Sequence, residues 1–535
     1  MLSPAFLLGE ELTPQSVARL FVKAQAFNDG IRLNENVRAC ENMYIGRQWE
    51  GLRAEGLPAV QMNFLRRVIS FKTASLCADS VTARAEVLRQ AGEANPLRPV
   101  AEVVNGEFAA LTENCRVPRL MRRFCEETAV RGDGCLYVYW DPSADSGAPG
   151  GARGAIACET LRNTHVYFGN TAEPRVQKQP YILIRSELPL FEAREKARRA
   201  GLGDRADTLS PDSAPDTAVN DPLRRDDTVT VLLLLWRQDG EIYAAEYTRE
   251  LCLRPPTALG LRLYPLVWMN WQRVSDCYHG CGEAQGLLPN QLAYNRAWSA
   301  VILSLLSNAW PRVLYDPTRI RGWDNRVGAV MKAPGGDVEG AAKILQGAPV
   351  PAQVLTYLQG FEQQTRESMG VTDAALGAGS ADNASAILAL QKAASTPLEL
   401  IRLDLYDAME DLYRIFLDFM AAYYGVRSVE TGMPAPVAEA FAFAAEADGA
   451  LSAPGTITMP FDFATLRDTV VNLRVDAGAG SYWSEVATVQ ALDNLLKAGA
   501  ITPAQYLRRV PAGLVPERDS LIAELEGLKN FKERV

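Results

Sequence analysis

Residues 283–308 read EAQGLLPNQLAYNRAWSAVILSLLSN, and this stretch decides the fold. It predicts a long helix that carries one acid, Glu283, and one base, Arg296, and that is apolar on nearly every side from Ala297 onward. A helix of this kind must be buried on several sides. Copies of the same chain packed in a closed ring would bury it. A monomeric α+β protein with a buried central helix is the alternative that the sequence leaves open.

Two further helices follow this stretch. The segment that separates the first two, residues 309–354, contains five prolines and is expected to be irregular. The second helix is expected at 355–369, and the third, at 397–424, is the clearest periodic element. The other face of the third helix has a charge balance of −4. Its apolar positions recur at steps of four and three residues, which predicts a packing face: Ile401, Leu405, Ala408, Leu412, Ile415, Phe419 and Ala422.

The chain before residue 283 is expected to form a helical part and then a β-rich layer over 134–270. β-branched and aromatic runs mark the strands, and Asp239-Gly240 is a strong hairpin turn signal. Residues 143–154 are expected to form a flexible loop. Residues 203–227 are rich in Asp, Pro and Ser and are expected to be a mobile insertion. Thr13-Pro14-Gln15-Ser16 predicts a capped start for the first of two helices within 13–47, and helical spacing and capping residues predict further helices at 62–77, 96–114 and 117–131.

After residue 425 the pattern changes again. An Ala/Pro/Gly-rich stretch runs to about residue 455, and strands are expected near 456–475. A C-terminal helical cluster is expected to follow, with helices at 484–498, from Thr502-Pro503 and from Pro516. The fold class predicted for the whole chain is α+β.

Composition limits the possible functions. The chain has 535 residues, with 64 Asp and Glu against 55 Lys and Arg and a formal net charge of −9. Tight general DNA binding is disfavoured, because such affinity comes from many phosphate contacts by basic residues. Nine scattered cysteines indicate reduced thiols. We expect no signal peptide and no membrane span, since no apolar run reaches about 18 residues.

The residues that could carry catalysis do not form a recognisable site. Gly335–Ala341 lacks the lysine of a phosphate-binding loop. His165 is expected to be structural, and Cys277-Tyr278-His279-Gly280-Cys281 is expected to be a loop with two half-buried thiols. We therefore expect no catalytic residue, no cofactor and no metal. Two charged groups are expected to be solvated faces, one acidic and one basic with ion pairs: Asp404, Asp407 and Asp411; and Arg116, Arg119, Arg122 and Arg123 with Glu126 and Glu127.

Several short motifs, in order along the chain, resemble the portal (head-to-tail connector) proteins of tailed bacteriophages. The resemblance covers about residues 34 to 510. One departure is Ala386, where members of the family often have glycine. The motifs are Asn42-Met43-Tyr44-Ile45-Gly46-Arg47-Gln48-Trp49, Gly56-Leu57-Pro58 and Asn63; Tyr278-His279-Gly280-Cys281-Gly282-Glu283 with Leu288, Gln291 and Asn295; Ala309-Trp310-Pro311; Gly370-Val371-Thr372-Asp373 with Leu376-Gly377; and Asn383-Ala384-Ser385-Ala386-Ile387.

The resemblance implies a ring, typically of twelve subunits, and a division of the chain into regions named as in that family. These regions are the wing (1–282, including the insertion 203–227), the first stem helix (283–308), the clip (309–354), the second stem helix (355–369), the tunnel-loop region (370–386), a long helix and further wing (387–455), and wing strands leading to a C-terminal helical crown (456–535).

The resemblance also implies a function and partners. The ring would sit at one vertex of the capsid in the virion, after assembly in the host bacterial cytoplasm, and double-stranded DNA would pass through it. The partners would be the large subunit of the terminase, head–tail adaptor proteins, and the major capsid and scaffolding proteins. A metal-dependent nucleic-acid enzyme and a monomeric scaffold protein are the alternatives.

The expected contact residues fall into three groups. The clip has a basic excess of +2 and is expected to contact an adaptor, the packaging motor or DNA. The candidates are, for the tunnel loop, Thr372, Asp373, Ser380, Asp382 and Asn383; for clip contacts, Arg319, Arg321, Arg326 and Lys332; and for the stem subunit interface, Leu292, Trp298, Val301, Ile302 and Leu305.

Overall fold

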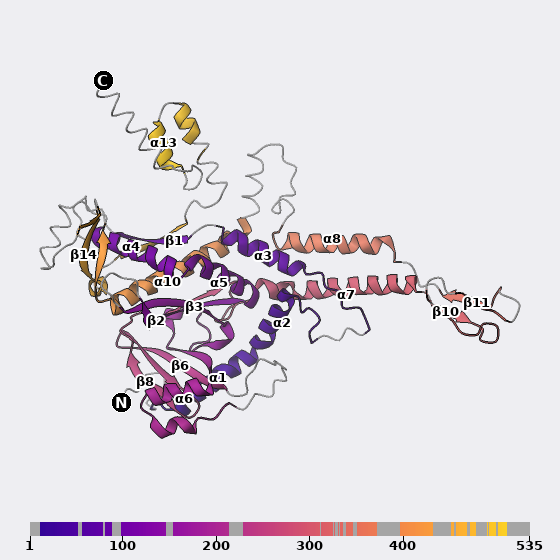
Figure 1. Ribbon diagram of the computed structural model, residues 1–535, viewed down its shortest axis with the longest axis horizontal. Coiled ribbons are helices and arrows are strands. Elements are labelled where there is room, and N and C mark those ends of the chain that lie inside the picture. The colour runs from indigo at the N-terminus through magenta and orange to yellow at the C-terminus, as the bar shows by residue number, and fades with distance from the viewer. Residues whose placement is uncertain are drawn as a thin grey trace.

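The structure is a computed structural model, and it shows an α+β body from which two helices extend as an arm (Figure 1). The residues that it describes are 11–51, 56–78, 81–87, 98–145, 153–212, 228–310, 312–324, 326, 330, 332–334, 339–345, 350–371, 396–431, 451–453, 456–467, 471–477, 489, 492–498 and 501–510.

The helices agree closely with the sequence prediction. Thr13 caps α1 and accepts a hydrogen bond from the backbone N–H of Ser16, and proline follows at the first helical position. The helices include α1 (Pro14–Gly30), α2 (Leu33–Ile45), α3 (Phe64–Leu76), α4 (Arg98–Asn114), α5 (Val117–Arg131), α6 (Leu190–Arg199), α7 (Glu283–Ala309), α8 (Ala352–Ser368), α10 (Glu399–Tyr423) and α13 (Pro503–Arg509).

The strands form separate small sheets. The β-rich layer predicted for 134–270 is confirmed as two of them, ordered β3-β2-β9 and β4-β5-β6-β7-β8. Asp239 and Gly240 have φ values of 53° and 82°, as a tight hairpin turn requires. The strands of these two sheets are β2 (Asp133–Asp145), β3 (Arg153–Leu161), β4 (Val166–Phe168), β5 (Tyr181–Pro189), β6 (Thr228–Gln238), β7 (Glu241–Tyr247), β8 (Cys252–Ala258) and β9 (Leu266–Asn270).

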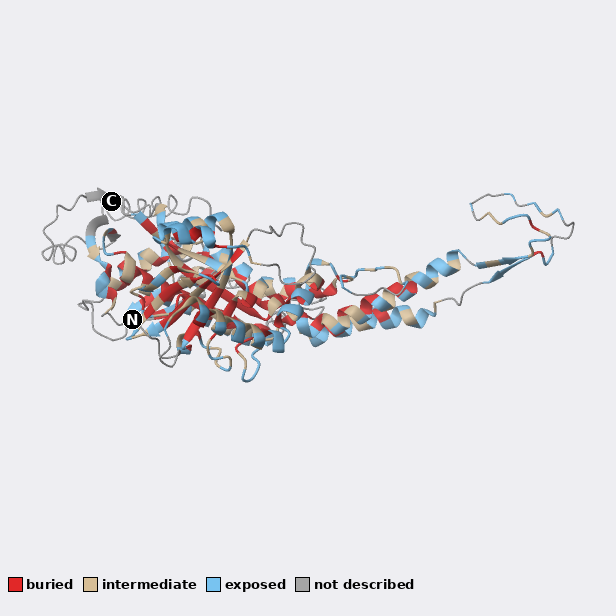
Figure 2. Cartoon of the chain, turned by 90° about the horizontal axis from the view of Figure 1, so that it is seen from below, coloured by how far each residue is buried: buried red, intermediate tan, exposed pale blue. Residues whose placement is uncertain are grey.

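The helix α10 lies in the core of the body. The apolar stripe predicted for it is confirmed, because its central members, Leu405 to Phe419, are buried. The helix packs against β9 and against β15 (Val471–Ala477), which pairs antiparallel with β1 (Val81–Val87). Figure 2 shows the resulting buried centre of the body. The core therefore joins segments that lie far apart in the sequence.

Two predictions for the β-rich layer are wrong in part. Residues 203–212 belong to the predicted mobile insertion, but they form a short 3-10 helix, Gly203–Thr208, that buries Ala206 and Leu209 beside α6. Their few apolar residues suffice because they pack against Ala193 and Ala197 of α6. In the expected loop at 143–154, β2 extends to Asp145 and β3 begins at Arg153. The rest of both stretches lies outside the described residues.

Two later stretches also contain more structure than expected. Within 309–354, β10 (Arg312–Tyr315) and β11 (Ala342–Leu345) pair antiparallel, because prolines flank these runs without interrupting them. Within the Ala/Pro/Gly-rich stretch, β12 (Val426–Thr431) and β13 (Leu451–Ala453) both pair with β14 (Thr456–Asp462). In the C-terminal cluster, Thr502 caps α13 as predicted. The helix expected from Pro516 lies outside the described residues.

Candidate functional site

The arm is formed by α7 and α8, and the β10–β11 hairpin lies beyond its end (Figure 1). The two helices are joined by aromatic and polar contacts near the body. The Tyr294 hydroxyl donates to Glu362 at 2.9 Å, and the Tyr294 ring stacks on Phe361 with centroids 6.2 Å apart. These contacts fix the direction in which the arm leaves the body.

Burial changes along α7. Its first part packs against α2, α3 and α5, and Ala284, Leu287 and Tyr294 are buried. Its last turns leave the body with their apolar side chains exposed (Figure 2). Leu305 is 55% exposed, Trp310 63%, and Tyr357 on α8 69%. The sequence prediction that the whole apolar stretch is buried therefore holds only for its first part within a single chain.

The five stem candidates are not equivalent. Leu292, Trp298 and Ile302 are half-buried, and Leu305 is exposed. Val301 is only 5% exposed and belongs to the core of its own chain. Of the five, Leu305 offers the most uncovered apolar surface, and Val301 the least.

A buried amide cluster attaches α7 to the body. Gln291 accepts from the backbone N–H of Leu65 at 3.0 Å and donates to the carbonyl of Met62 at 2.5 Å. Asn295 accepts from Gln291 at 2.9 Å and donates to Gln48 at 2.5 Å. Because buried amides cost free energy unless they are paired, this cluster selects one register of α7 against α3. The motif residues of both sequence regions thus meet here.

A buried ion pair lies at the start of α7, before this cluster. The Lys72 ammonium on α3 is 2.5 Å from Glu283, the first residue of α7, and the Trp271 indole donates to the other Glu283 oxygen at 2.9 Å. The side chains of Lys72 and Glu283 are 10% and 4% exposed. Two charges removed from water in this way require each other. Sequence reasoning missed Lys72, although its position in register with Leu65, Val68, Ile69 and Leu76 indicated a buried charge.

The loop before α7 approaches α5 closely. A Cβ on Gly282 would lie 2.8 Å from the Ala129 carbonyl oxygen and 2.8 Å from the Gly132 nitrogen, so only glycine fits. Asp133, at the start of β2, lies 2.6 Å from His279 Nδ1 and accepts from the backbone N–H of Gly280 at 2.6 Å. The residues of the Tyr278–Glu283 motif therefore position the arm.

The clip candidates lie around the β10–β11 hairpin. Arg319 is 3.6 Å from Asp316, and Arg326 is 2.7 Å from Asp324. The Arg326 side chain holds the pKa of Asp324 below its usual range. Arg321 and Lys332 are exposed, and among the described residues neither has an ion-pair partner. Arg319 and Arg326 are therefore neutralised by acidic side chains, whereas Arg321 and Lys332 have no acidic partner in the part of the chain described.

The expected tunnel-loop residues cannot be placed in the same way. Residues 372–395 lie outside the described residues, and this range includes all five candidates: Thr372, Asp373, Ser380, Asp382 and Asn383.

The other residues considered for chemistry have structural surroundings. Cys277 and Cys281 are half-buried, as expected. Burial, then Arg185 and Arg162, lowers the pKa of His165 to about 4. Asp404 is paired with Arg273 at 2.8 Å. Within the described ranges, no three His, Cys, Asp or Glu side chains gather as metal ligands would.

The basic group on α5 is only partly paired. Arg123 is 2.9 Å from Glu127, as predicted for surface ion pairing. Arg116, Arg119 and Arg122 are exposed. Glu126 instead accepts a hydrogen bond from the Tyr44 hydroxyl at 2.7 Å.

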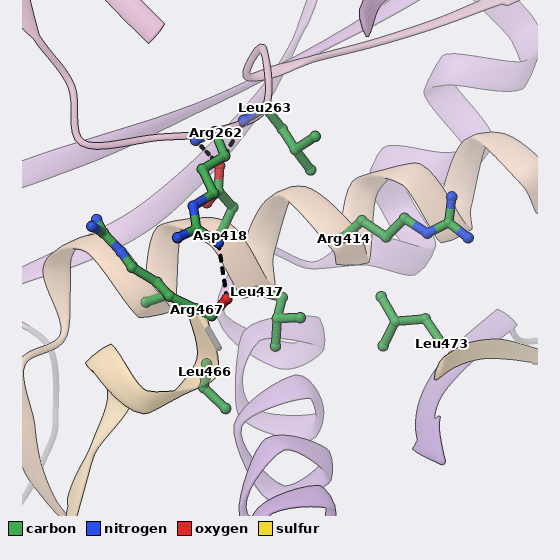
Figure 3. A pocket seen from close by; sticks show the side chains of 9 residues that line it. Arg262, Leu263, Arg414, Leu417, Asp418, Leu466, Arg467 and Leu473 are labelled. Carbon is green, nitrogen blue, oxygen red and sulfur yellow. Dashed lines mark hydrogen bonds between the residues drawn. The ribbon is translucent and has the colours of Figure 1, made fainter. Parts of the chain in front are cut away.

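A hollow of about 330 Å³ lies beside α10 (Figure 3). In it, Asp418 accepts from the backbone N–H groups of Arg262 and Leu263 at 2.7 and 2.9 Å, and burial raises the pKa of Asp418. Arg467 donates to the Gly260 carbonyl at 2.7 Å. These groups attach the 260–263 loop to α10. The polar atoms of the hollow therefore hold the fold together and do not form a nucleophile–base arrangement.

Comparison with known families agrees with the geometry of the arm. Residues 236–429, which include the arm, the hairpin and α10, match the family model described as Phage P22-like portal protein. This match supports a portal protein of tailed bacteriophages, as the sequence motifs predicted. More particularly, the matched part is similar to the P22-like kind; the motif at 42–63 lies outside it. No curated protein matches the chain. In the part of the chain that the structure describes, no helix has both the length and the hydrophobicity to cross a bilayer.

Proposed function

We propose that copies of this chain assemble into a ring, typically of twelve subunits, at one capsid vertex, and that double-stranded DNA passes through the ring. The ring would dock the terminase large subunit during packaging and head–tail adaptor proteins afterwards. It would contact the major capsid and scaffolding proteins during assembly in the host cytoplasm. The division into wing, stem, clip, tunnel loop and crown is part of this proposal.

The uncovered apolar surface at the end of the arm is the observation that carries the proposal. Leu305, Trp310 and Tyr357 are large and mostly exposed, and the arm is too narrow for one chain to cover them. Burying a leucine side chain fully contributes roughly 1.5–3 kcal/mol. A closed ring repeats this gain at every contact, because each arm lies beside the next one.

The charge distribution is compatible with DNA that slides. The chain is acidic overall, with a net charge of −9, so an assembled ring would hold few fixed phosphate contacts. Portal proteins are generally structural, and we propose no catalytic activity for this one. A metal-dependent nuclease and a monomeric scaffold are the competing functions.

The test is the assembly state of the full chain. Negative-stain microscopy and mass photometry should show a wheel with a central hole. Leu305→Glu should abolish it, because the charge would be trapped between neighbouring arms. Gln359→Glu is the matched control, since it adds the same charge at an exposed polar position of α8. A wild-type protein that stays monomeric at all concentrations would contradict the ring. DNA cleavage that depends on a divalent metal would favour the nuclease.

A further inference from the structure

The β10–β11 hairpin carries a concave surface that the ring proposal does not explain. A hollow of about 560 Å³ lies there, lined by Arg321, Gly322, Trp323, Asp324, Val330, Lys332 and Pro334. We name it the clip hollow. It combines an exposed apolar side chain, Val330, and a half-buried indole, Trp323, with cations that have no acidic partner among the described residues.

The apolar part of the clip hollow consists of Trp323 and Val330. Val330 is 89% exposed. Trp323 is half-buried, and its ring stacks on Tyr315 with centroids 6.1 Å apart, which holds the indole in place on the hairpin. A rigid aromatic surface beside an uncovered valine fits an apolar or aromatic side chain of a partner.

The charged part consists of Arg321 and Lys332. Among the described residues, neither side chain has an ion-pair partner. The acid that lines the hollow, Asp324, is already neutralised, because Arg326 donates to both of its oxygens at 2.7–3.1 Å. The lining residues therefore present a net positive charge to whatever enters the hollow, although the whole chain is acidic.

We propose that the clip hollow binds an acidic segment of a partner protein, with one apolar or aromatic side chain against Trp323 and Val330 and carboxylates on Arg321 and Lys332. The proposal rests on the proposed function, because it gives the clip its partner chemistry. Duplex DNA fits less well. A DNA backbone offers phosphates and sugars but no large apolar or aromatic side chain to pack on Trp323 and Val330. Charge complementarity with the two cations selects an acidic protein segment.

The experiment measures binding by the assembled full-length protein. The probe is a short fluorescein-labelled peptide with one phenylalanine between glutamates, and anisotropy reports its binding. Two control peptides replace the glutamates by glutamine or the phenylalanine by serine. We expect each control to bind about tenfold more weakly, since each removes one of the two kinds of contact. A fluorescein-labelled DNA duplex is measured in parallel.

Two double variants separate the hollow from the general charge of the clip. Arg321→Glu with Lys332→Glu should weaken peptide binding by about a hundredfold, because two attractive charges become repulsive. Arg312→Glu with Lys343→Glu makes the same charge change at exposed positions of the hairpin and should leave binding nearly unchanged. Negative-stain micrographs of both variants check that the ring is intact.

Four results would overturn the proposal. The first two are no binding of the acidic peptide and an equal loss of binding in both double variants. The third is DNA binding that is as tight as peptide binding and that is also lost in the Arg321→Glu, Lys332→Glu variant. The fourth is a ring that dissociates only in this variant, because the hollow would then be a contact between copies of the chain. Failure of the ring proposal is distinguishable, because mass photometry and micrographs of the wild-type protein report assembly, whereas the peptide assay reports binding whether the protein is a ring or a monomer.

Discussion

Removing one charge of the Lys72–Glu283 pair should destabilise the protein strongly, whereas removing both should not. The perturbation is a pair of single variants, Lys72→Met and Glu283→Gln, together with the double variant. The amide introduced by Glu283→Gln keeps an acceptor for the Trp271 indole, so the substitution mainly removes the negative charge. Each single variant leaves the other charge buried without its partner.

The magnitude follows from the burial of the pair. The two side chains are 10% and 4% exposed, and their charged atoms are 2.5 Å apart. Breaking a buried pair by removing one partner costs about 3–5 kcal/mol, whereas replacing both charges costs little. We therefore expect each single variant to lose about 3 kcal/mol of unfolding free energy, and the double variant to remain within about 1 kcal/mol of wild type. Arg38 and Glu50, 3.4 Å apart and exposed, form the control pair, with an expected coupling below about 1 kcal/mol.

Urea unfolding at one fixed protein concentration is the assay, because assembly makes stability depend on concentration. Tryptophan fluorescence is a suitable signal, since Trp271 contacts Glu283 directly. The coupling energy comes from the double-mutant cycle. A coupling between Lys72 and Glu283 no larger than that of the control pair would refute the reasoning that this base of the arm is a buried electrostatic contact.

Three further predictions concern the same region and His165, which lies just before β4. Gly282→Ala should destabilise the protein by about 2–4 kcal/mol, because its Cβ would meet backbone atoms at 2.8 Å; Gly286→Ala, with open space around it on the helix that follows, should be neutral or stabilising by up to about 1 kcal/mol in thermal unfolding. Asn295→Ala should cost about 1–3 kcal/mol, since Gln48 and the Met62 N–H lose their partner, and a smaller loss in urea unfolding would contradict the cluster. His165 has a pKa of about 4 in the folded chain, against an ordinary value of 6.5. The unfolded chain therefore binds an extra proton between these values, and the free energy of unfolding should fall as the pH drops from about 6.5 toward 4. His165→Gln should flatten this part of the stability–pH curve, and an unchanged curve would count against a buried neutral histidine.

Much of the fold could be predicted from local patterns. The apolar stripe of α10, the Thr13 cap and the Asp239-Gly240 turn are properties of neighbouring residues, and all three are confirmed. The ordered structure of residues 203–212 around Ala206 could not be predicted. It depends on packing against α6, and the composition of the segment itself does not show that contact. The β12 strand escapes prediction for the same reason, since its partner β14 lies some thirty residues further along the chain.

The candidate site could be predicted less completely. The motifs around Gln48 and Asn295 are recognisable by their order in the chain, but their physical role, a shared buried amide cluster, is not visible in the sequence. Lys72 gives no local signal of a partner, because Glu283 is 211 residues away. The clip hollow could not be predicted, because its cations become a site only when Trp323 and Val330 lie beside them.

The amino-acid sequence alone determined the order of most helices and strands, the acidic balance and the apolar end of α7, because these depend on the identity and spacing of nearby side chains. Only the tertiary structure decided which apolar side chains remain exposed to solvent and which charged side chains have an ion-pair partner among the described residues. Val301 and Leu305 are both apolar residues of α7, four positions apart, yet Val301 is buried against its own chain and Leu305 is exposed. The physical reason is that burial and pairing depend on distances between segments, and only the folded chain sets those distances.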